Sequence, residues 1–121
     1  MKLWVDDIRN APDDTWTVAR TITAAFNILS KMDAEIISLD HDISHQVSIG
    51  TGLERPFPCP ETFVPVAHYA GLNHSAKKFH LHTSNPVGAR VMKDLLMHYG
   101  YDEKDIEIRP MGAANRLEME V

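Results

Sequence analysis

Side chains that can do chemistry follow four short apolar runs of this sequence, at the point where each run ends. These groups are Asp6-Asp7, Asp40-His41-Asp42, His82-Thr83-Ser84-Asn85 and Arg109-Pro110. Carboxylates bind hard divalent cations, and histidines transfer protons near neutral pH. Guanidinium groups hold two oxygens of a phosphate at once. If the four groups meet in the folded chain, they could bind a metal ion together with a phosphate.

Asp6, Asp7 and Asp40 are the candidate metal ligands. Carboxylates that converge in a cleft repel one another, and a bound proton or cation relieves that repulsion. Oxygen ligands suit Mg²⁺ or Mn²⁺, whereas ligation by a histidine would favour Mn²⁺, Zn²⁺ or iron. The alternative is that these aspartates only cap helices and turns.

His41 and His82 are candidate catalytic residues beside Asp40, because an imidazole can act as a general acid or base near neutral pH. Either could instead be a hydrogen-bonded structural histidine. His80 lies two residues before His82, so both side chains should point to the same face of a strand. We expect His80 to lie deeper and to be structural.

Thr83 and Asn85 precede a helix that Pro86 is expected to open. Free backbone N–H groups and the dipole at a helix start favour an anion, so Thr83 and Asn85 could donate to a phosphate there. Arg9 and Arg109 are the candidate phosphate clamps. The alternatives are that Asn85 is a plain helix cap and that Arg9 is an ordinary surface residue.

The elements that must position these groups alternate along the chain. Apolar and β-branched runs predict strands at residues 2–6, 16–20, 35–39, 78–83 and 106–109. Helical spacing and end signals predict helices at residues 22–32, 61–73 and 86 to about 99. This order predicts an α/β fold with a five-stranded parallel sheet, in which functional groups collect at the carboxyl ends of the strands.

The chain has 121 residues, with 12 Lys or Arg and 17 Asp or Glu, so its formal net charge is −5. This length predicts a single domain over residues 1–121. The acidic balance argues against a broad footprint on duplex nucleic acid. The single cysteine excludes an internal disulfide. With neither a signal peptide nor an apolar run near the ~20 residues of a membrane span, we expect a cytoplasmic protein.

Three segments depart from a regular α/β pattern. Residues 43–60 hold glycines and prolines without a period, which predicts a long loop beside the site. Residues 7–15 are too short for a packed helix, and residues 110–121 allow only a short helix or a tail. One apolar face of the sheet would then lack its helices. We hypothesise that a second copy covers it in a homodimer, or that residues 110–121 fold across it.

In order and type, the four groups resemble the receiver domain of two-component signalling. That family has an acidic pair after strand one, an aspartate after strand three, a Thr or Ser after strand four and a Lys-Pro after strand five. The matching residues here are Asp6-Asp7, Asp40, Thr83 and Arg109-Pro110. The resemblance implies a flavodoxin-like, receiver-like fold whose first helix is missing and whose last is short or absent. Arg109 replaces the receiver lysine, which argues against phospho-relay signalling.

A closer resemblance is to the receiver-like family proposed to process cyclic phosphates in RNA repair and conflict systems. Its motifs are matched by Asp6-Asp7-Ile8-Arg9, Ser38-Leu39-Asp40-His41-Asp42 and His82-Thr83-Ser84-Asn85-Pro86-Val87-Gly88. The loop at residues 43–60 is longer than the family pattern.

The resemblance implies a metal-dependent phosphoesterase-like enzyme that acts on a nucleotide or RNA-end phosphate, cyclic phosphates included. An alternative from another class is a non-catalytic receiver-like module that binds a nucleotide or a protein partner, such as a phage or defence-system accessory protein. A third reading is an authentic receiver that is phosphorylated on Asp40.

Overall fold

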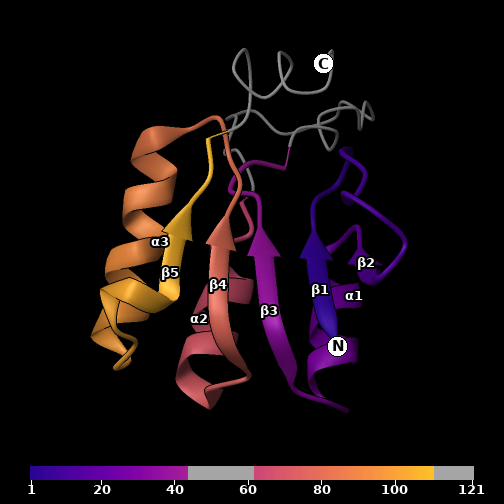
Figure 1. Cartoon of the computed structure of the whole chain (residues 1–121), viewed down its shortest axis with the longest axis horizontal. Helices are drawn as coiled ribbons and strands as arrows, with labels where there is room; N and C mark the ends of the chain where they lie inside the picture. The colour runs from indigo at the N-terminus through magenta and orange to yellow at the C-terminus, as the bar shows by residue number, and fades with distance from the viewer. Residues whose placement is uncertain (44–61, 111–121) are drawn as a thin grey trace, which may run out of the picture.

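The computed structural model describes residues 1–43 and 62–110, which build a parallel sheet with helices packed on one side (Figure 1). The strands are β1 (Lys2–Val5), β2 (Trp16–Ala19), β3 (Ala34–Leu39), β4 (Ala76–Leu81) and β5 (Ile106–Ile108). The helices are α1 (Ile22–Leu29), α2 (Val64–Asn73), α3 (Pro86–His98) and the short 3₁₀ helix η2 (Glu103–Asp105). The five strands lie in the order β2-β1-β3-β4-β5, all parallel.

This architecture confirms the predicted α/β fold with a five-stranded parallel sheet, and the strand order is that of doubly wound, flavodoxin-like domains. Several boundaries differ by one to three residues, and β4 begins and ends two residues earlier than predicted. His82 and Thr83 therefore lie just beyond the strand and not within it. The helix η2 was not predicted.

Local signals explain where the helices begin. The Thr21 side chain accepts a hydrogen bond from Ala24 N–H and caps α1. Pro65 lies in the first turn of α2, where its missing N–H costs no helical hydrogen bond. His74 ends α2 in the left-handed conformation, at φ 51°.

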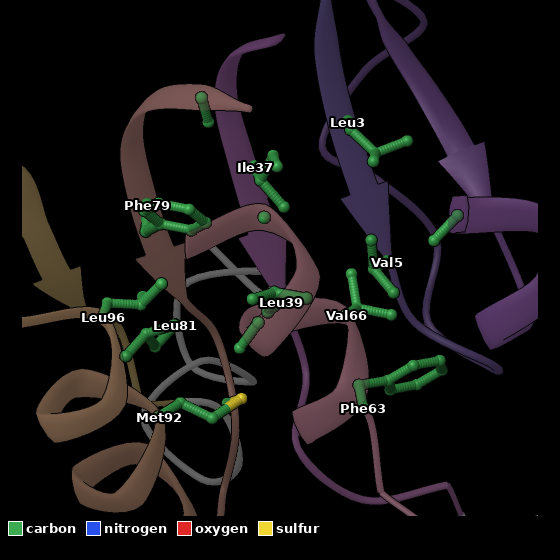
Figure 2. Packing of buried hydrophobic residues seen from close by; sticks show 14 of the residues in the cluster. Leu3, Val5, Ile37, Leu39, Phe63, Val66, Phe79, Leu81, Met92 and Leu96 are labelled. Atoms are coloured by element: carbon green, nitrogen blue, oxygen red, sulfur yellow. The ribbon is translucent and has the colours of Figure 1, made fainter. Parts of the chain in front are cut away.

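The hydrophobic core lies between the sheet and the helices (Figure 2). Alternate strand residues point into it, because side chains in a strand alternate between the two faces. The labelled strand residues are Leu3, Val5, Ile37, Leu39, Phe79 and Leu81, and those from the helical side are Phe63, Val66, Met92 and Leu96. All ten are fully buried, and burial of each such side chain stabilises the fold by roughly 1.5–3 kcal/mol.

The opposite face of the sheet carries the other alternate residues, and no helix of the described residues covers it. Residues 6–15 contain no helix, as predicted, while the predicted tail after Pro110 lies outside the described residues. The face is less apolar than expected. The polar residues Lys78, His80 and Glu107 lie on the part of this face formed by β4 and β5. Its aromatic side chains lie on β1 and β2.

The predicted loop at residues 43–60 lies outside the described residues except for Ile43. The residues that flank it are joined by an antiparallel bridge between Asp42 and Thr62. In addition, Phe63 N–H donates to the His41 carbonyl at 2.8 Å. Nowhere in residues 1–43 and 62–110 is a helix long and apolar enough to cross a membrane.

Candidate functional site

The site lies at the ends of four strands. The first residue after each of these strands still takes part in the ladder of backbone hydrogen bonds. These N–H···O bonds run from Asp6 to Ala19 (3.2 Å), Asp40 to Val5 (3.0 Å), His82 to Leu39 (2.9 Å) and Arg109 to Leu81 (2.8 Å). The backbone of each residue is therefore fixed by the sheet. Since the strands are parallel, all four residues lie at one edge.

Asp6, Asp7 and Asp40 form a carboxylate cluster, in which one oxygen of each residue lies within 4.8 Å of the others. One oxygen of Asp6 accepts hydrogen bonds from the N–H groups of Ile8 and Arg9, both at 2.9 Å. Burial alone would raise the pKa of Asp6. Hydrogen bonds from His82 and from these two N–H groups outweigh burial and hold the pKa below its ordinary value.

Asp40 is 5% exposed, and its environment favours the charged carboxylate far less than that of Asp6 does. Burial raises the pKa of Asp40 to about 6, and the charge of Asp6 adds to this shift. The backbone N–H of His41 (2.8 Å), the charge of Arg9 and the Thr83 side chain oppose it. A bound cation would therefore favour the charged form of Asp40. Three hard oxygen donors in such a place fit Mg²⁺ or Mn²⁺, so these residues could hold a metal ion.

His82 is buried beneath Trp4, with the two rings stacked 3.8 Å apart and 9° from parallel. Its Nε2 lies 3.0 Å from Asp6 Oδ2, and its Nδ1 lies 2.6 Å from Ser38 Oγ. Burial lowers the pKa of His82, although Asp6 opposes that shift. The neutral ring then donates from Nε2 to Asp6 and accepts at Nδ1 from Ser38. This placement suits a residue that orients Asp6, and proton transfer by His82 stays a prediction.

His41 lies closer to solvent, with its side chain 13% exposed. Its Nδ1 is 2.7 Å from an Asp42 carboxylate oxygen, which also accepts from Asn85 Nδ2 at 3.3 Å. The ring packs on the backbone of Gly88, where a Cβ would stand 2.4 Å from the ring Cγ. Gly88 is therefore required because any larger residue at this position would collide with the ring of His41.

The first turn of α3 connects the cluster to the helix. Asn85 caps α3 by accepting from Gly88 N–H at 3.0 Å, and phosphate binding by Asn85 stays a prediction. Thr83 Oγ1 accepts from Asn85 N–H at 3.1 Å, and the Thr83 side chain also hydrogen-bonds Asp40. The candidate phosphate residues Thr83 and Asn85 thus lie beside the cluster.

The two candidate arginine clamps differ in position. Arg9 lies across the cluster, with Nη1 3.8 Å from Oδ2 of both Asp6 and Asp40. Arg109 is turned back along β5, where its guanidinium donates to Glu107 at 2.9 and 3.2 Å. The structure therefore brings Arg9 to the cluster, and phosphate binding by either arginine stays a prediction.

Three residues of the site were given no role from the sequence, although Ser38 belongs to the second motif. Ser38 and Trp4 complete the surroundings of His82. Arg20 Nη1 donates to the carbonyls of Arg9 (2.7 Å) and Asp6 (3.2 Å) and holds the loop after β1. The alternation of residues along β1 and β3 was the available signal for Trp4 and Ser38, because it puts both on the face of His80.

The parallel sheet in the order β2-β1-β3-β4-β5, with an acidic cluster at its carboxyl edge, defines a receiver-like domain. The profile of the cyclic-phosphate processing receiver domain matches residues 1–98, and the chain belongs to that family. This confirms the resemblance read from the three motifs. Comparison with curated proteins and with solved structures gives no match.

Proposed function

We propose that the chain is a metal-dependent phosphoesterase that acts on a nucleotide or RNA-end phosphate, with cyclic phosphates as the first substrates to test. One observation carries this proposal: the cluster of Asp6, Asp7 and Asp40 lies beside the first turn of a 13-residue helix. A buried carboxylate cluster suits a divalent cation, and a helix start suits the phosphate that the cation would share. The family match supports the same substrate class.

The side chains take distinct roles in this proposal. Asp6, Asp7 and Asp40 hold Mg²⁺ or Mn²⁺, which when bound supplies a Lewis acid and an activated water. Thr83 and Asn85 orient the phosphate. His41 is the better placed proton donor of the two histidines, because it is partly exposed and Asp42 fixes its ring.

The test is a panel of nucleoside cyclic phosphates and terminal phosphates with Mg²⁺ or Mn²⁺, assayed for release of product. We expect turnover of at least one class, and a fall of about 100-fold or more in Asp40→Asn, because that variant removes a charged ligand. Asp94→Asn is the matched control, since Asp94 is an exposed carboxylate on α3. Its turnover should equal that of the unmodified chain.

Two results would contradict the enzyme. Tight binding of a nucleotide without turnover would identify the non-catalytic module. A phosphorylated Asp40 that persists after treatment with acetyl phosphate would identify an authentic receiver.

A further inference from the structure

The backbone of Arg9 is held in place from several sides. Its N–H donates to Asp6 Oδ1 at 2.9 Å. Its carbonyl accepts from Trp4 Nε1 at 3.0 Å and from Arg20 Nη1 at 2.7 Å. Arg20 also donates from Nη2 to Asn10 Oδ1 at 2.8 Å, which holds the next residue of the same loop. The start of the Arg9 side chain is therefore fixed beside the carboxylate cluster.

The guanidinium of Arg9, in contrast, is loosely held. Its Nη1 stands 3.8 Å from one oxygen of Asp6 and 3.8 Å from one oxygen of Asp40, which is too long for a hydrogen bond. The side chain is 37% exposed, so water competes with both contacts. A single positive charge thus lies over two buried carboxylates without the paired hydrogen bonds that arginine can form.

A divalent cation at the cluster would neutralise the same two carboxylates as the Arg9 guanidinium. Such an ion binds carboxylate oxygens at about 2.1 Å, much nearer than the guanidinium, and it carries twice the charge. If both cations stayed at the cluster, they would repel each other across a short distance. The weaker contact, which is that of Arg9, is the one that would yield.

We infer that Arg9 is an exchangeable cation: it partly neutralises Asp6 and Asp40 in the metal-free protein, and metal binding releases its guanidinium to bind the phosphate of the ligand. The inference rests on the proposed metal site and extends it to ligand binding. Arg9 would then contact the carboxylates in the metal-free protein and the phosphate in the metal-bound protein. The inference also predicts that the metal and the phosphate strengthen each other's binding, because coupling between two sites is reciprocal.

Calorimetric titration of the full chain with Mn²⁺, and then with inorganic phosphate, tests this exchange. In Arg9→Gln no cation has to leave, so we expect Mn²⁺ to bind about three- to tenfold more tightly than to the unmodified chain. Phosphate affinity of the Mn²⁺-loaded protein should fall about tenfold or more, since the guanidinium that would bind the phosphate is missing. Arg90→Gln is the matched control, because Arg90 is exposed on α3 and its loss changes the net charge equally.

The outcomes separate this inference from the proposed metal site. If Mn²⁺ does not bind the unmodified chain, the metal site itself is wrong. If Mn²⁺ binds but Arg9→Gln matches Arg90→Gln in both titrations, the metal site stands and the exchange is overturned. Arg9→Lys covers the case in which Arg9→Gln does not fold. It keeps the charge, so Mn²⁺ affinity should stay within about twofold while phosphate affinity falls.

Discussion

Two aspartates that lie side by side experience opposite environments. Asp6 receives hydrogen bonds from His82 and from two backbone N–H groups, which hold its pKa down. Asp40 is buried beside the resulting negative charge, and its pKa rises to about 6. The free-energy cost of ionising the cluster therefore falls mainly on Asp40, because that carboxylate must be ionised before it can bind a cation.

Replacement of Asp40 should therefore stabilise the metal-free protein in a pH-dependent way. The folded chain keeps a proton on Asp40 that the unfolded chain releases between about pH 4 and pH 6, so this residue lowers the free energy of unfolding as the pH rises. The shift corresponds to at most about 3 kcal/mol. We expect Asp40→Asn to be about 1–3 kcal/mol more stable at pH 7.5 in a chelator and equal to the unmodified chain near pH 4.

Urea unfolding across that pH range measures the effect. Asp94→Asn should show no such gain, because its carboxylate is exposed. A gain for Asp40→Asn that is the same at pH 4 and pH 7.5 would contradict the ionisation argument.

At the scale of the elements, α3 and the end of β3 fit together through one glycine. The cap at Asn85 sets where α3 begins, and Gly88 then presents bare backbone to the ring of His41. A side chain at Gly88 cannot be accommodated unless His41 moves. The helix start and the candidate proton donor are thus positioned by the same contact.

Gly88→Ala should lower stability despite the better helix propensity of alanine. The gain of up to about 1 kcal/mol is offset by overpacking against His41, so we expect a net loss of about 1–2 kcal/mol. Turnover should fall about 10-fold or more if His41 transfers a proton. The double variant Gly88→Ala with His41→Ala removes the clash and should recover the stability lost, as measured by thermal unfolding. Equal losses in the single and double variants would exclude the contact as the cause.

The sequence could predict the strands and the edge at which they end, because each apolar run stops at a charged or turn-forming residue. It could also place Asp6, Asp7 and Asp40 together, since parallel strands end on the same side. The surroundings of His82 could be predicted only in part, because alternation indicates which residues of one strand share a face but does not align neighbouring strands. They depend on the register between β1, β3 and β4 and on which face of the sheet each residue takes, and a short apolar run does not specify either.

At the scale of the whole molecule, the two faces of the sheet differ. Helices cover one face, whereas the other presents Trp16 and Val18 toward one edge and charged side chains toward the opposite edge. The homodimer stays a prediction, and this composition limits its contact to the half of the face formed by β1 and β2. Aromatic and aliphatic side chains grouped in this way commonly mark a protein interface.

Light scattering at micromolar concentration tests the homodimer. We expect the full chain to be a dimer and Trp16→Glu to be a monomer, because a buried carboxylate at the contact has no partner. Leu72→Glu is the control, since Leu72 is 58% exposed on α2 and should not affect association. A monomeric unmodified chain would show that no second copy covers this face.

The bridge between Asp42 and Thr62 has a consequence for how this protein can diversify. It brings the two ends of the segment between these residues together at the edge of the site. Doubling the length of such a closed segment costs only about 0.6 kcal/mol of chain entropy. Insertions after the core residue Ile43 and before Thr62 should therefore cost the fold little stability, and such insertions could differ between relatives that keep the same carboxylates.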